Sequence, residues 1–166
     1  MIEFMVIGLP RSGTAWIANW LTTDTTTCIH DPLAINHYRD LDSIKSEKML
    51  GISCTALWAF PDYVNSHKAR KVIVHRNLKE INSSLSNIGL PQFKDGMDEK
   101  LSCLNGIHIW KDQLFKDPEF IYEYLTGKKF DRERFETLKE LKIERKIDSM
   151  KFDIDNFTAM QEEMRG

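Results

Sequence analysis

The sequence predicts an α/β fold in which helices cover both faces of a central, mostly parallel sheet of about five strands, giving three layers. One observation is a short, nearly continuous apolar run over residues 2–7 that ends at Gly8, the pattern of a strand buried on both faces. Another is the alternation of such runs with segments of helical periodicity. With 166 residues and no dividing linker or internal repeat, the chain is expected to form a single domain over 1–166.

Each element follows from a local pattern. Proline suits the first turn of a helix at Pro61, and Gly89 with Pro91 closes a helix. The predicted strands are 2–7, 25–29, 51–58, 71–75 and 107–110. The predicted helices are 15–21, 40–49, 61–68, 78–88, 97–104, a segment from Asp117 that breaks at Gly127, the amphipathic stretch 132–143, and a charged tail, 149–166, as a terminal helix or a partly loose segment.

Composition excludes several classes of protein. A formal net charge of −2 argues against a surface built for bulk attraction to nucleic acid or membranes, so any anion site must be local. The N-terminal run has no basic leader, and no stretch approaches the roughly 20 apolar residues of a membrane-spanning helix. Three distant cysteines, Cys28, Cys54 and Cys103, form no CxxC pair and predict reduced thiols. We expect a cytoplasmic protein with neither a nucleic-acid nor a membrane partner.

A glycine-bearing loop, residues 8–14, lies between the first predicted strand and the first predicted helix. Backbone N–H groups in such a turn close around a phosphate, and the helix dipole adds to the attraction. Gly8 and Gly13 have the GxxxxG spacing of the nucleoside-triphosphate P-loop, but no lysine precedes Thr14, and the cation is Arg11 inside the loop. The alternative is a tight turn with an exposed arginine. The strand, helix, cation and hydroxyls together favour a P-loop that binds phosphate.

A second anion-binding element follows the predicted strand 71–75. Ligands collect at the carboxyl ends of parallel strands, so Arg76 is expected at the same edge of the sheet as the phosphate loop. Ser84 lies eight residues later, about two helical turns along, and shares a face with the start of that helix. Taken singly, Arg76 fits a surface salt bridge and Ser84 a solvated helix position. Taken with the loop, they predict a second phosphate site.

The strands lack the feature that phosphoryl transfer usually needs. Kinases and ATPases of the P-loop class hold Mg²⁺ with an aspartate after an apolar strand, together with the loop lysine and hydroxyl. The strand 71–75 ends in His75 and Arg76 instead. Sulfuryl transfer, whose donor group carries fewer charges and does without that metal, suits these residues better.

Two motifs resemble the sulfotransferase superfamily that uses 3′-phosphoadenosine 5′-phosphosulfate, PAPS. The segment PRSGTAW at 10–16 is similar to its 5′-phosphosulfate loop, and VHRNLKEINSS at 74–84 is similar to its 3′-phosphate element. A softer likeness to its YEDL…DP…FLG…FD stretch runs from Trp110 to Asp131. Departures are Ala15 for a threonine, Leu78 for a proline, no histidine in 53–56, and no RKG segment, although Arg145 and Lys146 supply charge.

The resemblance implies a P-loop, nucleotide-kinase-like fold and the following roles. PAPS would be the donor, adenosine 3′,5′-bisphosphate the product, and a small molecule or glycan the acceptor, with no metal required. Arg76 and Ser84 would bind the 3′-phosphate. Trp16 would pack beside the adenine or, equally well, be a core tryptophan of the first helix. The 5′-phosphosulfate would be held by Arg11, Ser12, Gly13, Thr14 and Ala15.

Transfer also needs a base for the acceptor proton and a cation over the developing charge. Arg11 supplies the cation. His30 and Asp31 follow the second predicted strand, at the edge where the donor is expected. Asp31 either accepts the proton itself or orients His30. Alternatively, Asp31 with Pro32 begins a turn and His30 is merely polar. His75, beside Arg76, is interpreted as structural.

Two other functions stay open beside the sulfotransferase. A nucleotide or small-molecule kinase would bind ATP tightly with Mg²⁺, which the missing lysine and aspartate disfavour. A catalytically idle module that still holds adenosine 3′,5′-bisphosphate fits the short chain and the absent histidine. The acceptor and the oligomeric state are not determined by the sequence.

Overall fold

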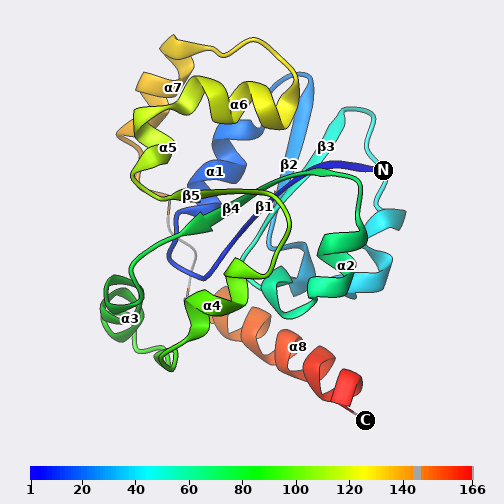
Figure 1. Ribbon diagram of the computed structural model, residues 1–166, viewed down its shortest axis with the longest axis vertical. Coiled ribbons are helices and arrows are strands. Elements are labelled where there is room, and N and C mark those ends of the chain that lie inside the picture. Colours follow the sequence, from blue (N-terminus) through cyan, green and yellow to red (C-terminus); the bar gives the residue numbers. More distant parts are fainter. Residues whose placement is uncertain (144–146, 166) are drawn as a thin grey trace.

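The sheet is parallel throughout and has the strand order β2-β3-β1-β4-β5 (Figure 1). A computed structural model describes residues 1–143 and 147–165, with the side chains of 1–143 and 154–165. The strands are β1 (Ile2–Gly8), β2 (Thr26–His30), β3 (Met49–Cys54), β4 (Arg70–His75) and β5 (Ile107–Trp110). The expected α/β class and five-stranded parallel sheet are therefore confirmed.

Helices flank this sheet. The α-helices are α1 (Thr14–Leu21), α2 (Pro61–Ser66), α3 (Leu78–Ser86), α4 (Met97–Ser102), α5 (Gln113–Lys116), α6 (Pro118–Thr126), α7 (Arg132–Lys139) and α8 (Ile147–Arg165). Short 3₁₀ helices are η1 (Pro32–Ala34), η2 (Tyr38–Ser43) and η3 (Leu57–Ala59). Figure 1 shows α1, α5, α6 and α7 together on one side of the sheet and α2, α4 and α8 on the other.

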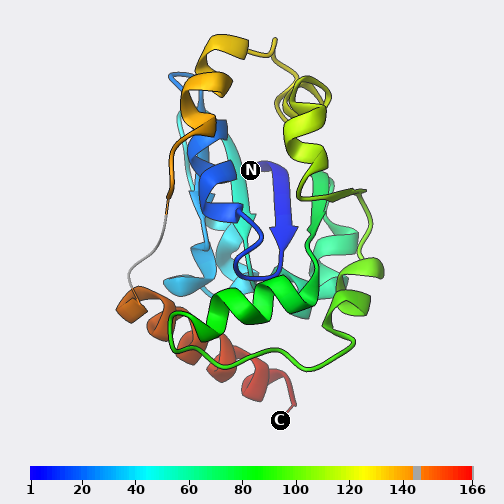
Figure 2. The ribbon, with the colours of Figure 1, turned by 90° about the vertical axis from the view of Figure 1, so that its left-hand side faces the viewer.

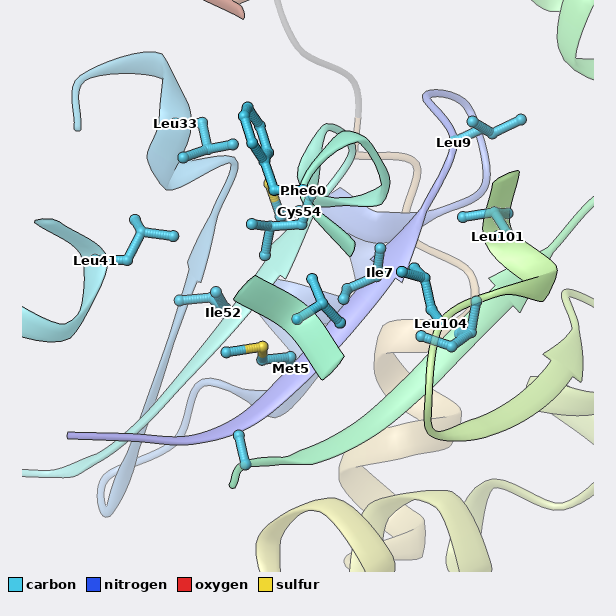
Figure 3. Close-up of a cluster of buried hydrophobic side chains, with 14 of the residues drawn as sticks. Met5, Ile7, Leu9, Leu33, Leu41, Ile52, Cys54, Phe60, Leu101 and Leu104 are labelled. Carbon is cyan, nitrogen blue, oxygen red and sulfur yellow. The ribbon is translucent and has the colours of Figure 1, made fainter. Parts of the chain in front are cut away.

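Alternate side chains of the central strand enter two separate cores, one on each face of the sheet. Phe4 and Val6 of β1 belong to the cluster that includes residues of α1, α5, α6 and α7. Met5 and Ile7 belong to the other cluster, with residues of α2, α3, α4 and α8 (Figure 3). Because a strand presents successive side chains to opposite faces, an apolar run is what a strand covered on both faces requires. The layers are helix, sheet and helix, as expected.

The position of the site follows from the helices after β1 and β4. These strands are neighbours, yet α1 packs on one face of the sheet, while α3, through Ile81 and Leu85, packs on the other. Their connecting loops therefore diverge and leave a crevice at the carboxyl edge, the usual ligand position in an open parallel sheet. Figure 2 shows β1 pointing toward α3, with α8 beyond it.

Three predicted elements are wrong in part. The helix expected over 132–143 ends at Lys139. Residues 40–43 belong to the short helix η2, residues 44–48 connect it to β3, and Met49 begins β3. Leu41 alone is buried in η2, and the Arg39 N–H donates to the His37 side chain, which caps the helix. The strand predicted for 51–58 is instead Met49–Cys54. It stops there because the N–H of Thr55 donates to the carboxylate of Asp31 at 2.6 Å rather than to a neighbouring strand.

The C-terminal helix is packed against the fold rather than loose. Asn156 of α8 donates to the carbonyl of Leu33, Phe157 contacts Trp58 with ring centroids 5.6 Å apart, and Met160 is buried in the core. Gly166, the last residue of the predicted tail, lies outside the described residues. Within the described parts of the chain, no helix combines the length and apolarity that crossing a membrane requires.

The central strands pack closely at Gly51, where a larger residue would not fit. Gly51 is directly opposite Phe4 in the β1–β3 register, and a Cβ atom at this position would overlap the Phe4 ring. Since Phe4 is fully buried, the ring has no solvent to move into. We expect Gly51→Ala to lower the free energy of unfolding by about 1–3 kcal/mol, measured by urea denaturation.

The matched control reduces the ring instead. In a Phe4→Leu background, Gly51→Ala should cost less than in the wild-type chain, because the two ring atoms that overlap most, Cε2 and Cζ, are gone. Strictly additive costs of the two substitutions would contradict this account of the overlap.

Candidate functional site

A cavity of about 590 Å³ lies at the carboxyl edge of the sheet. Residues that follow β1, β2, β3, β4 and β5 all contribute to its wall, as do α8 and the segment after α7. The described lining residues that carry polar or charged side chains are Arg11, Thr14, His30, Asp31, Thr55, Arg76, Gln92, Lys111, Lys139, Lys142 and Thr158. A volume of this size is typical of sites for small organic ligands.

The loop between β1 and α1 has the conformation that its glycines permit. Gly13 is the N-cap of α1 with φ of 88°, a left-handed value that costs glycine little and other residues more. Arg11 also adopts a positive φ, 68°. Ser53 of β3 donates from Oγ to the Thr14 carbonyl at 2.8 Å, which ties the loop to the neighbouring strand. The loop therefore exposes the N-terminus of α1 to the cavity, where anions bind favourably.

The structure brings the two predicted anion-binding elements together. Arg11 Nε donates to Ser84 Oγ at 2.8 Å, across 73 residues of sequence. Arg76 donates from a terminal guanidinium nitrogen to the Arg11 carbonyl, and its Nε donates to Glu80 at 3.1 Å. The salt bridge considered for Arg76 thus exists, alongside its contact with the loop. Both guanidinium groups lie at one cavity, which a single ligand can span.

Other predicted residues of the loop occupy different depths. Thr14 is buried, lines the cavity and contacts His30. Gly13 and Ala15 also line the cavity. Ser12 is fully buried behind the loop, and its hydroxyl has no hydrogen-bond partner among the described residues. The N–H of Ser12 donates to the Leu9 carbonyl at 3.2 Å, so the turn itself uses that donor.

Trp16 serves the core and borders the cavity. It is buried against Trp20, Phe115 and Phe135, and its indole Nε1 donates to the carbonyl of Leu138 at 2.7 Å. The same side chain is part of the cavity wall. The two sequence-based interpretations of Trp16 are therefore compatible in geometry.

His30 and Asp31 form a connected pair beside the loop. His30 Nε2 lies 3.1 Å from Thr14 Oγ1 and 3.5 Å from Asp31 Oδ2. The other Asp31 oxygen accepts the N–H of Thr55, and the N–H of Asp31 donates to the Ser53 carbonyl at 2.8 Å. Asp31 is almost fully buried, with φ of 45°, whereas His30 is more exposed. The carboxylate is thus fixed by backbone contacts, and the imidazole faces the loop.

Positive charge is concentrated in this cavity although the chain as a whole is slightly acidic. The described cationic side chains in its wall are Arg11, Arg76, Lys111, Lys139 and Lys142, against one described carboxylate, Asp31. This concentration of positive charge is what a local anion site would require. Lys111, Lys139 and Lys142 were missed by the sequence analysis. Lys111 directly follows β5, so the strand-end argument used for Arg76 would have found it.

The cavity also has an apolar half. Its walls come from the segments after β2, β3 and α3, the segment after α7, and α8. Its members are Leu33, Trp58, Leu90, Phe93, Leu141, Ile143, Ile154 and Phe157. Cys54 borders it but is fully buried, and burial, with Asp31 as the second cause, raises the pKa of its thiol far above the ordinary value. That thiol is accordingly protonated and unreactive.

The site can be compared with the binding of a doubly phosphorylated nucleotide. Two cationic groups from separate strand ends, a glycine-capped helix N-terminus and a cavity of suitable volume fit such a ligand. Arg145 and Lys146 lie outside the described residues. Among the described residues, no group of three or more His, Cys, Asp or Glu side chains could hold a metal ion.

No model of a known protein family matches the chain, and no curated protein matches it significantly.

His75 has a contact outside this cavity. Its Nε2 lies 2.8 Å from His108 Nδ1, and His108 Nε2 lies 2.9 Å from the Leu104 carbonyl. The carbonyl requires His108 to donate from Nε2, so His108 Nδ1 accepts and His75 donates. Burial, followed by the effect of His108, lowers the pKa of His75.

The lowered pKa of His75 predicts a loss of stability in acid. The unfolded chain takes up a proton near the ordinary value of 6.5 while the folded chain does not, so unfolding becomes more favourable as the pH falls through 6.5. The loss is complete below the folded-state pKa. We expect the urea midpoint to fall more steeply between neutral pH and pH 5.5 in the wild-type chain than in His75→Gln. Parallel pH profiles would contradict this role of His75.

Proposed function

We propose that this chain is a sulfotransferase of the PAPS-dependent superfamily, which moves a sulfuryl group to a hydroxyl or amine of an acceptor. The observation that carries the proposal is the meeting of the phosphate loop with the helix after β4, through the Arg11–Ser84 bond and the contact of Arg76 with the Arg11 carbonyl. Two cationic groups at one cavity suit a ligand with two separate phosphates, which adenosine 3′,5′-bisphosphate and its sulfated form both carry.

The two ends of the proposed nucleotide would contact different elements of the fold. The loop and the N-terminus of α1 would hold the 5′-phosphosulfate, with Arg11 as its cation. Arg76 and Ser84 would hold the 3′-phosphate. Trp16 borders the cavity and would contact the adenine. These roles follow the resemblance. Arg11, Thr14 and Arg76 are part of the described cavity wall, whereas Ser12 and Ser84 are not.

His30 is the group best placed to take up the acceptor proton. The acceptor oxygen forms a bond to sulfur while the bond between sulfur and the 5′-phosphate oxygen breaks, and the proton of the acceptor passes to the His30 ring. Asp31, 3.5 Å from His30 Nε2, stabilises the imidazolium that results. Arg11 stabilises the charge that develops on the departing phosphate. When bound, PAPS supplies the sulfuryl group and leaves as adenosine 3′,5′-bisphosphate.

The apolar half of the cavity supports an acceptor with an apolar body. Such a body would lie against Trp58, Phe93 and Phe157 and extend from the polar end, where the reacting hydroxyl or amine must be. Burial of apolar surface would then contribute to acceptor binding, while the loop and the strand ends hold the donor.

Ligand-dependent thermal stability tests the nucleotide. Adenosine 3′,5′-bisphosphate should raise the melting temperature of the wild-type chain by mass action, and more than ATP with Mg²⁺ does. Arg76→Ala should weaken binding of the bisphosphate by about tenfold or more, because a charged hydrogen bond is lost. Lys79→Ala, an exposed charge in the first turn of α3, is the matched control and should leave binding unchanged.

The other outcomes have definite meanings. A larger effect of ATP with Mg²⁺ would replace the proposal with a kinase. Binding of the bisphosphate without turnover of labelled PAPS across a broad acceptor panel would identify an idle binding module. An unchanged affinity in Arg76→Ala would remove Arg76 from the site.

Turnover tests the proton acceptor. His30→Ala should lower turnover of PAPS by roughly 10²–10⁴-fold while retaining the thermal shift with the bisphosphate. Asp31→Asn should lose less, because asparagine tolerates the left-handed backbone and still accepts the Thr55 N–H. His37→Ala, outside the cavity wall, is the control. If Asp31→Asn is inactive and His30→Ala is fully active, Asp31 is itself the base.

A further inference from the structure

We infer that Lys111 is a third cation of this site and contacts the 5′-phosphate of the bound nucleotide, an assignment that rests on the proposed function. Lys111 is the first residue after β5, and its N–H donates to the His75 carbonyl at 2.8 Å, continuing the ladder between β4 and β5. Its backbone is therefore fixed at the edge where Arg76 follows β4. The resemblance gave Lys111 no role, since the comparable position of the YEDL motif is acidic.

The side chain of Lys111 reaches the phosphate loop. Its Cε lies 3.5 Å from the position that a Cβ atom on Gly13 would occupy, and the side chain is part of the cavity wall. Gly13 is the N-cap of α1, a helix of eight residues. The ammonium group, one bond beyond Cε, is thus held beside the loop and close to the N-terminus of that helix.

This position is electrostatically unfavourable for a cation. A helix N-terminus carries partial positive charge, and Arg76 and Arg11 are further positive neighbours. Burial first, and then Arg76, lowers the pKa of Lys111, with Arg11 adding to the effect and Glu80 opposing it. Among the described residues, no carboxylate lies within ion-pair distance of the Lys111 ammonium. An anionic ligand that contacts Lys111, Arg76 and Arg11 together would account for the placement of these three cations in one cavity.

The geometry assigns Lys111 to one end of that ligand. Arg76 already contacts Glu80 and the Arg11 carbonyl on the side of α3, where Ser84 also lies. Lys111 instead lies over Gly13, at the phosphate loop. In the proposed reaction its ammonium would donate to oxygens of the 5′-phosphate and offset the charge that this phosphate gains as the bond to sulfur breaks.

Nucleotides that carry a single phosphate separate the two ends. We expect Lys111→Met to weaken binding of adenosine 3′,5′-bisphosphate and of 5′-AMP on the order of tenfold to one hundredfold, and to leave 3′-AMP unchanged. Lys111→Arg keeps the charge and should retain most of the affinity. Lys116→Met, a lysine of α5 with 72 % of its side chain exposed, is the matched control. Dissociation constants are measured by calorimetry, with the bisphosphate as competitor for the monophosphates.

The outcomes distinguish this inference from the function on which it rests. Unchanged binding of the bisphosphate and 5′-AMP to Lys111→Met, or a loss confined to 3′-AMP, overturns the assignment of Lys111 while leaving the nucleotide site intact. An equal loss for 3′-AMP and 5′-AMP, with no recovery in Lys111→Arg, indicates a structural role and also overturns it. If the wild-type chain binds none of these nucleotides, the proposed function fails and the role of Lys111 with it.

Discussion

The adjacency of β1 and β4, whose following helices leave on opposite faces of the sheet, is the constraint on which the site depends. The hydrogen-bonded ladder between these strands fixes their carboxyl ends side by side, so the loop after β1 and the residues after β4 must meet. The bond between Arg11 and Ser84 spans 73 residues of sequence and is possible only because of this adjacency. Backbone hydrogen bonds to the neighbouring strand fix Asp31 after β2 and Lys111 after β5 in the same way.

A second theme is the segregation of charge. The chain has a slight excess of acidic residues, yet the described wall of the cavity carries five cations and one carboxylate. Bringing like charges together in a partly desolvated space opposes folding, and the proposed anionic ligand would relieve this cost. In this cavity burial first, and then the positive charge of Arg76, lowers the pKa of Lys111. Ligand binding and stability should therefore be strongly linked in this protein.

The cavity is also divided along its length. The strand ends and the loop provide its polar half, whereas α8 and the segments after β2, β3 and α3 provide its apolar half. Phe157 and Met160 anchor α8 to the core, and Asn156 ties it to the carbonyl of Leu33. α8 thus completes the apolar wall of the cavity, which the strands alone do not supply. Residues of α8 therefore border the same cavity as the residues proposed to act in the reaction.

The sequence by itself determined the fold class, the strands apart from their exact ends, and the meeting of Arg11 with Arg76, because apolar periodicity and strand-end position are local properties of the chain. It misjudged 40–49 and the end of β3, where side-chain bonds from His37 and Asp31 replace regular backbone pairing. The link from His30 to Thr14, the approach of Lys111 to Gly13 and the wall formed by α8 were decided only by the tertiary structure. These contacts join segments distant in sequence, and their partners are set by how the layers pack rather than by any local pattern.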